Sequence, residues 1–198
     1  MDAMHRRILV IQGHPDASAP HLCHALEAAY AQGARDGGHD VRRLDVASLE
    51  FPLLRSQREW ESAALPPALE EAQAAVAWAQ HLVLVFPLWL GDMPALLKGF
   101  LEQIARPGFA FRAERPDAAF HKGLTGRSAR VVVTMGMPAS VYRWYFGAHS
   151  VKSLERNVLG FVGISPVHRT LIGMVGNLKP ASASKHLHLL AKLGRQAI

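Results

Sequence analysis

The stretch HLVLVFPLWLGDMPALLKGFLEQI, residues 81–104, decides the fold. It begins with an unbroken apolar run at 82–86, rich in β-branched and aromatic side chains. Such a run is typical of a strand that is buried on both faces of a parallel sheet. Pro87 cannot donate a ladder hydrogen bond, so we expect the strand to end there. After the loop at 88–93, apolar residues recur at helical spacing from Pro94, which predicts a helix.

Four more segments have the composition of strands, and helical patterns separate them. The predicted strands lie at 8–11, 40–46, 130–134 and 167–172. The predicted helices, besides the one that begins at Pro94, lie at about 21–34, 68–80, 152–159 and 181–193. The segments at 47–67 and at about 106–128 show no clear period, and we expect long connections there.

Strands that alternate with helices predict an α/β doubly wound parallel sheet of five strands with helices on both faces. The chain contains neither the GxGxxG motif nor the P-loop motif. Their absence favours the flavodoxin-like strand order over that of classical dinucleotide-binding folds. We expect residues 1–198 to form a single flavodoxin-like domain, because this length suits one large core.

Composition limits the classes of partner. The 22 Lys and Arg residues exceed the 16 Asp and Glu residues by 6, but they are scattered, without the basic stripe of nucleic-acid-binding proteins. The single cysteine, Cys23, excludes an internal disulfide and favours a reducing compartment. No signal-peptide core is present, and the longest apolar stretch is far shorter than the roughly 20 residues of a spanning helix. We therefore expect a cytoplasmic protein with no nucleic-acid partner and no membrane insertion.

Two other chemistries are not expected. His21 and His24 have helical i, i+3 spacing, but no carboxylate or thiolate cluster accompanies them beyond Cys23, so we predict no metal site. Ser18 lacks the G-x-S-x-G context of a hydrolytic nucleophile.

The predicted topology brings three loops together. Parallel strands end at the same edge of a sheet, so the loops at 12–20, 87–93 and 135–140 meet where open α/β sheets bind ligands. The first loop precedes a helix, whose free N–H groups suit a phosphate. An ordinary capped helix, with Ser18 or Asp16 satisfying only the backbone, explains this loop equally well. The second loop carries an indole and large aliphatic side chains, which suit a flat apolar ligand.

Four stretches together resemble the flavodoxin-like NAD(P)H:quinone oxidoreductase family, which includes DT-diaphorase and bacterial modulators of drug activity. They are GHPDAS at 13–18, FPLW at 86–89 with MPALLKGFLE at 93–102, RPGFAF at 106–111, and a Thr-x-Gly loop at 134–136 with a tyrosine and a histidine downstream. The resemblance implies a homodimer that binds FMN or FAD and passes hydride from NAD(P)H to a quinone-like acceptor. It also implies an active site that is completed across the dimer interface. The short chain has no obvious adenine-binding insertion, which favours FMN.

The resemblance also assigns site residues. The phosphate-contacting positions correspond to His14, Ser18, Pro20 and His21. The walls of the isoalloxazine site correspond to Pro87, Leu88, Trp89 and Leu90 on one side and to Thr134, Met135, Gly136 and Met137 on another. The residues that hydrogen-bond the substrate or the reduced flavin correspond to Tyr142 and His149.

Two features of this sequence leave alternatives open. The family's usual Thr-Thr-Gly-Gly loop has Met135 and Met137 in place of its second and fourth residues, so we expect altered access to the ring. Tyr142 also suits an aromatic dimer patch with the residues Trp144, Tyr145 and Phe146, an explanation of nearly equal weight.

Other functions remain in competition with quinone reduction. Relatives of the family sit on potassium-efflux transporters, which makes a regulatory flavin- or nucleotide-sensing subunit the alternative outside the enzymes. An azo- or nitro-reductase differs only in its acceptor. The sequence does not distinguish these acceptors, nor NADH from NADPH.

Overall fold

The computed structural model describes residues 5–112 and 121–198. Its centre is an all-parallel sheet with the strand order β2-β1-β3-β6-β7. The strands are β1 (Arg7–Gln12), β2 (Asp40–Asp45), β3 (His81–Pro87), β6 (Ser128–Thr134) and β7 (Val167–Ile172). The predicted flavodoxin-like order is confirmed, with β1 and β3 as neighbours. The assignment of residues 1–198 to one domain stays a prediction.

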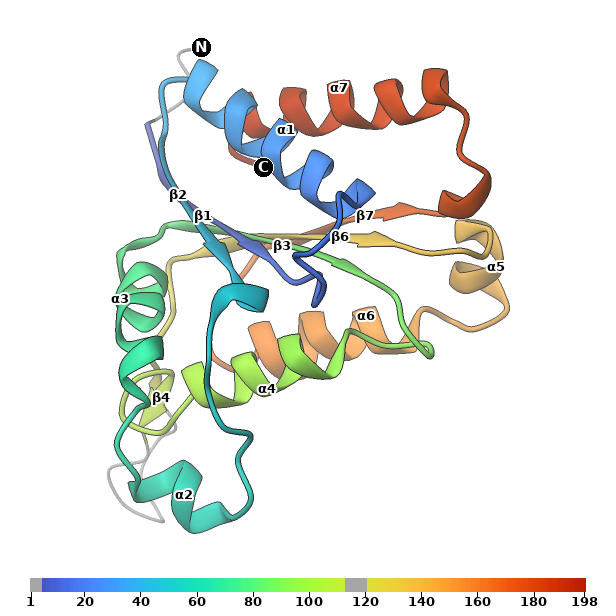
Figure 1. Cartoon of the computed structure of the whole chain (residues 1–198). Helices are drawn as coiled ribbons and strands as arrows, with labels where there is room; N and C mark the ends of the chain where they lie inside the picture. Colours follow the sequence, from blue (N-terminus) through green and yellow to red (C-terminus); the bar gives the residue numbers. More distant parts are fainter. Residues whose placement is uncertain (1–4, 113–120) are drawn as a thin grey trace.

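Helices cover both faces of the sheet (Figure 1). On one face lie α1 (Leu22–Asp36) and α7 (Pro180–Gln196). On the other face lie α3 (Glu70–Trp78), α4 (Ala95–Ile104) and α6 (His149–Ser153), which continues as the π-helix η3 (Leu154–Leu159). The short helix α5 (Ala139–Trp144) lies beside the carboxyl ends of β6 and β7. Among the described residues, no helix is both long and apolar enough to cross a membrane.

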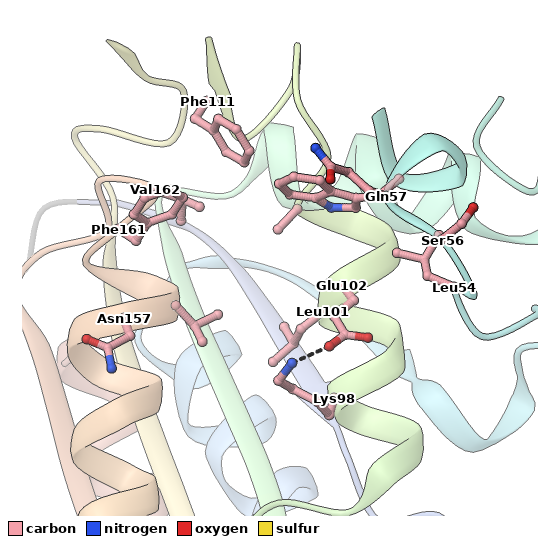
Figure 2. A pocket seen from close by; sticks show the side chains of 13 residues that line it. Leu54, Ser56, Gln57, Lys98, Leu101, Glu102, Phe111, Asn157, Phe161 and Val162 are labelled. Carbon is pink, nitrogen blue, oxygen red and sulfur yellow. Dashed lines mark hydrogen bonds and ion pairs between the residues drawn. The ribbon is translucent and has the colours of Figure 1, made fainter. Parts of the chain in front are cut away.

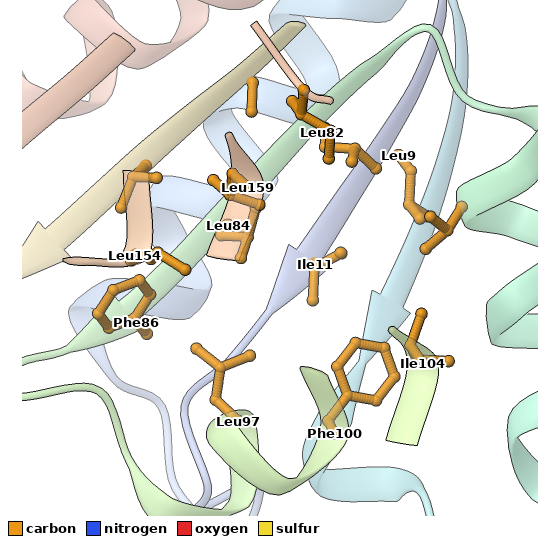
Figure 3. Packing of buried hydrophobic residues seen from close by; sticks show 14 of the residues in the cluster. Leu9, Ile11, Leu82, Leu84, Phe86, Leu97, Phe100, Ile104, Leu154 and Leu159 are labelled. Carbon is orange, nitrogen blue, oxygen red and sulfur yellow. The ribbon is translucent and has the colours of Figure 1, made fainter. Parts of the chain in front are cut away.

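The central strand is buried on both faces, as its composition predicts. All seven residues of β3 are buried. Leu82, Leu84 and Phe86 pack in the cluster that includes Leu97, Phe100 and Ile104 of α4, and Figure 3 labels these residues. The alternate residues of the strand pack against α1 on the opposite face. Each face of β3 therefore belongs to a different hydrophobic cluster.

The long connections contain structure that periodicity does not reveal. Residues 47–67 were expected to lack regular elements, but they include η1 (Val46–Ser48), α2 (Gln57–Ser62) and the start of η2 (Pro67–Leu69). Two buried polar residues from the end of α4 and just after it, Gln103 and Arg106, anchor the connection at 47–67. Arg106 Nη1 donates to the carbonyl of Ala63 at 2.5 Å, and Gln103 Nε2 donates to the carbonyl of Pro52 at 2.7 Å.

The connection expected at about 106–128 holds a two-stranded antiparallel ladder of β4 (Phe111–Arg112) and β5 (His121–Lys122). Its middle lies outside the described residues. The helix expected at 152–159 begins three residues earlier, at His149. A further short helix, η4 (Val175–Asn177), follows β7.

Helices α1 and α7 touch through glycines. A Cβ atom added at Gly33 of α1 would lie 2.0 Å from the carbonyl oxygen of Ala191, and one added at Gly194 of α7 would lie 2.2 Å from that of Tyr30. Both obstacles are backbone atoms, which cannot move aside as a side chain can. The two helices therefore approach more closely than any other residue type allows at these positions.

We expect Gly33→Ala and Gly194→Ala each to lower the free energy of unfolding by about 1 to 3 kcal/mol, because the added methyl group forces the helices apart. Helix propensity by itself predicts the opposite sign, since alanine stabilises a helix interior relative to glycine. Chemical denaturation followed by circular dichroism measures the effect. Gly176→Ala is the control, because a Cβ atom there meets nothing within 4 Å. Unchanged denaturation midpoints for both helix variants would contradict the close contact.

Candidate active site

Three loops meet at the carboxyl edge of the sheet, as the topology predicts. Gly13 N donates to the carbonyl of Val85 at 2.8 Å, which ties the first loop to β3. Leu88 N donates to the carbonyl of Thr134 at 2.7 Å, which ties the second loop to the third. The rings of Trp89 and His14 meet edge to face, with centroids 5.8 Å apart. The loops thus form one continuous surface.

In the first loop, several donors converge on the carboxylate of Asp16. Ser18 donates from its backbone N at 2.8 Å and from Oγ at 2.5 Å, and His21 Nε2 lies 2.8 Å from the other oxygen. The Ser18 hydroxyl, followed by His21, holds the pKa of Asp16 well below its ordinary value. The loop beside the N-terminus of α1 therefore already binds one anionic group. The same donors suit a phosphate oxygen.

His14 contacts the backbone of Asp16 and is buried, with 6% of its surface exposed. Its ring stacks on His21 with centroids 3.9 Å apart, and His24 lies 5.4 Å away. Burial first, and then the neighbouring His21 and His24, lower the pKa of His14. Its Nδ1 accepts the backbone N–H of Asp16 at 3.1 Å, so the neutral ring carries its proton on Nε2. His14 is therefore a fixed hydrogen-bond donor.

A shallow cavity of about 340 Å³ adjoins the first loop. Its lining includes the exposed residues Ser18 and Pro20, together with His24 and Asp45. Among the described residues, no group of three His, Cys, Asp or Glu side chains is arranged to hold a metal ion.

The second loop is a tight turn that holds apolar side chains out to solvent. Trp89 and Asp92 exchange two backbone hydrogen bonds, of 2.8 and 3.0 Å. Between them, Leu90 and Gly91 have φ values of 48° and 82°. The left-handed conformation costs a leucine on the order of 1 kcal/mol. Leu90 is nonetheless fully exposed, and Trp89 is half exposed, so this strained turn presents an apolar wall.

The third loop offers free backbone donors. The N–H groups of Gly136 and Met137 have no acceptor in the part of the chain that the structure describes. A Cβ atom at Gly136 would meet nothing within 4 Å, so the space there is open. Met135 is buried, and Met137 is half buried against the same core cluster. The altered access to the ring that Met135 and Met137 lead us to expect stays a prediction.

Three residues expected to contact the isoalloxazine, Pro87, Leu88 and Thr134, are buried or half buried and hold the loops together. Thr134 is buried, and its Oγ1 lies 3.2 Å from Cys23 Sγ while its carbonyl accepts from Leu88. Pro87 is buried at the end of β3, and Leu88 is half buried.

The two expected catalytic residues differ in their exposure to solvent. Tyr142 is 2% exposed, and its hydroxyl lies 2.6 Å from Ser150 Oγ and accepts from Val151 N at 3.4 Å. His149 is exposed at the first position of α6. A catalytic role for either residue stays a prediction.

Comparison with known proteins places the chain in a family. The family described as "Flavodoxin-like fold" matches residues 6–193. The chain belongs to this flavodoxin-like family. A relative from Haemophilus influenzae, named "Uncharacterized NAD(P)H oxidoreductase", is 23% identical over 188 residues, covering 93% of this chain and 92% of its own. The FMN-dependent NADH:quinone oxidoreductase of Ruegeria pomeroyi is 30% identical over 135 residues, covering 62% of this chain and 65% of its own.

Solved structures agree on the fold. The NAD(P)H:quinone oxidoreductase from Methanothermobacter marburgensis superposes with a TM-score of 0.76 at 21% identity, covering 96% of this chain and 98% of its own. The resemblance seen in the sequence is thereby confirmed at the level of the flavodoxin-like family.

A second cavity of this flavodoxin-like chain lies away from the three loops. It is an apolar groove of about 460 Å³ between α2, β4, the second half of α4 and the end of η3 (Figure 2). Leu101, Phe161 and Val162 line it, and the ion pair of Lys98 with Glu102 lies at its side. Because α4 begins at the loop edge and only its later residues reach the groove, the groove is not part of the candidate active site.

Sequence reasoning missed the roles of Asp16 in the first loop and of His24 in α1. Asp16 was considered only as a helix cap, and His24 only as a metal ligand. The Asp-x-Ser spacing was a usable signal for the observed turn, because an aspartate often accepts from the backbone two residues on. The histidine stack had no such signal, since it depends on how the loop folds back over α1.

Proposed function

We propose that this protein is a flavin-dependent NAD(P)H oxidoreductase that binds FMN at the carboxyl edge of its sheet and reduces a quinone-like acceptor. One observation carries the proposal. Anion-binding donors at Ser18 and free backbone donors at Gly136 and Met137 lie on loops joined by the apolar turn of Trp89 and Leu90. The relatives named as NAD(P)H and FMN-dependent NADH:quinone oxidoreductases support it.

The first loop fits the phosphate of FMN. Ser18 and His21, which now bind the Asp16 carboxylate, would donate to the phosphate oxygens, and His14 would add a further donor. Pro20 lines the adjoining cavity. Because a phosphate dianion and a carboxylate repel each other, Asp16 must move aside.

The other loops fit the ring. Trp89 and Leu90 supply the apolar wall, and the N–H groups of Gly136 and Met137 suit the polar edge of the isoalloxazine. FMN, when bound, takes a hydride from NAD(P)H and delivers it to the acceptor. Pro87, Leu88, Thr134 and Met135 hold these groups in position from the core.

We keep Tyr142 and His149 as proposed contacts of the acceptor. His149 is exposed and free to reach it. Tyr142 can do so only by exchanging Ser150 for the acceptor as its hydrogen-bond partner. We also propose a cytoplasmic location, since the one cysteine, Cys23, is a free thiol.

The relatives' names favour an enzyme over the regulatory subunit of a potassium-efflux transporter. FAD stays the alternative cofactor and an azo or nitro compound the alternative acceptor, because such enzymes select acceptors by the shape of the pocket.

The test of the function is an absorbance spectrum after FMN or FAD is added and excess flavin is removed. We expect the protein to retain FMN and the flavin band to bleach on anaerobic addition of NADH or NADPH. Benzoquinone, azo and nitro compounds are then compared as oxidants of the bleached protein. Failure to retain either flavin would refute the proposal.

Variants of the first loop test the phosphate site. We expect Ser18→Ala and His14→Ala each to weaken FMN binding about tenfold, because each removes a hydrogen bond to a charged group. Asp16→Asn should strengthen binding, because it removes the competing charge. Quenching of FMN fluorescence measures the affinities. Ser48→Ala and Asp36→Asn, at exposed positions on other elements, are the matched controls. Wild-type affinity of Ser18→Ala and Asp16→Asn would contradict the assignment, whether or not the His14 variant folds.

We propose a homodimer whose interface borders the active site, as the resemblance implies. Supporting it, Tyr145 is 82% and Phe146 47% exposed beside the loop edge, where they pack edge to face. Exposed aromatic patches of this kind mark interfaces.

Light scattering after size exclusion checks the assembly. We expect a dimer for the wild type and a monomer for the double variant Tyr145→Ser with Phe146→Ser. Phe161→Ser, in the separate groove, should remain dimeric. A monomeric wild type at micromolar concentration would disprove the dimer, and a monomeric Phe161→Ser alone would move the interface to the groove.

A further inference from the structure

A third cavity, of about 530 Å³, lies between α5 and the edge strand β7. Helix α5 contributes Ala139, Ser140, Arg143 and Trp144, which recur at helical spacing and therefore share one face. Strand β7 contributes Arg169 and Leu171. Of the neighbouring aromatic residues, Trp144 lines this cavity, whereas Tyr145 and Phe146 do not.

Two guanidinium groups and one aromatic ring meet in the cavity. Arg143 forms no ion pair with any described residue, and its guanidinium carbon lies 5.2 Å from the centre of the Trp144 ring. The indole is 77% exposed. Arg169 Nε lies 3.3 Å from Glu155 Oε1, but without hydrogen-bond geometry. Both guanidinium groups therefore keep donors for a ligand.

This combination suits a phosphorylated nucleoside. Guanidinium groups bind phosphates through parallel N–H donors, and they do so better than lysine because the donors are fixed in a plane. An exposed indole stacks on a purine ring. A quinone needs neither of these features, since it is small and carries no phosphate.

The cavity adjoins the third loop of the candidate active site. Met174 N, just after β7, donates to the carbonyl of Met137 at 3.1 Å. A Cβ atom at Gly173 would lie 2.4 Å from Ala139 N, so the end of β7 packs against the start of α5. The third loop, at 135–140, runs directly into α5, and its last residues, Ala139 and Ser140, line the cavity. A dinucleotide whose nicotinamide lies over Gly136 thus has this cavity within reach of its adenosine half.

We propose that the cavity binds the adenosine 2′-phosphate of NADPH, so that Arg143 and Arg169 select NADPH over NADH. The proposal rests on the function proposed above and names its electron donor. Arg143 and Arg169 bind the 2′-phosphate and Trp144 stacks on the adenine. Glu155 opposes the selection, because its carboxylate competes with the phosphate for Arg169.

Calorimetric titration with two nucleotide fragments tests the site without any redox chemistry. Adenosine 2′,5′-bisphosphate carries the distinguishing phosphate, and adenosine 5′-monophosphate lacks it. We expect the wild-type protein to bind the bisphosphate at least about tenfold more tightly. Arg143→Ala and Arg169→Ala should each remove most of that preference. Glu155→Gln should increase it, which a merely structural role for these residues does not predict.

The chain offers a matched control for the arginine variants. Arg42 also lies over a tryptophan, 4.2 Å from the centre of the Trp78 ring, but on β2 at the opposite edge of the sheet. Arg42→Ala should leave the preference unchanged. In steady-state kinetics with FMN, the variants Arg143→Ala and Arg169→Ala should raise KM for NADPH about tenfold. They should leave kcat and the KM for NADH unchanged.

The outcomes separate this proposal from the function on which it rests. Equal binding of the two fragments by the wild-type protein would overturn the site, even if FMN is bound and reduced. A preference for the bisphosphate that Arg143→Ala and Arg169→Ala leave intact would also overturn it. Preference for the bisphosphate in a protein that retains no flavin would refute the oxidoreductase and leave the nucleotide site standing.

Discussion

Every side chain of β3, from His81 to Pro87, is buried, and the rest of the structure depends on that burial. A strand with two apolar faces needs both of them covered, and the helical crossover connections of a parallel sheet provide that cover. Parallel pairing of β1, β3 and β6 then brings their carboxyl ends to one edge. The loops of the candidate site are neighbours for this reason, although more than a hundred residues separate the first from the third.

At that edge, buried and exposed groups have different roles. Buried residues such as Thr134 hold the loops, while Trp89 is half exposed and the amides of Gly136 and Met137 have no acceptor among the described residues. The carboxylate of Asp16 meanwhile keeps the donors of the first loop aligned. No single loop carries both the donors gathered on an anionic group and the exposed apolar side chains, which lie on the first and the second loop.

The part of the site that sequence reasoning recovered is the part carried by local signals. Proline lacks the N–H that a strand interior needs and suits the start of a helix, and these properties do not depend on distant residues. Pro87 and Pro94 therefore located the second loop correctly. The turn formed by Leu90 was not foreseen, because a leucine in the left-handed conformation contradicts its own preference. Nor was the burial of Tyr142 foreseen, since its partner Ser150 lies on the next helix. The connection at 47–67 likewise depends on Arg106, far along the chain.

The sequence by itself determined the five strands of the main sheet, its principal helices, their order and therefore the edge at which the three loops meet. These features follow from periodicity and from proline and glycine, which act within a few residues. Only the tertiary structure decided the close approach of Gly33 to α7, the donors gathered on Asp16, and the meeting of Arg143 with Arg169. Such contacts join residues from different elements, and their geometry depends on how the helices pack on the sheet, which no local pattern records.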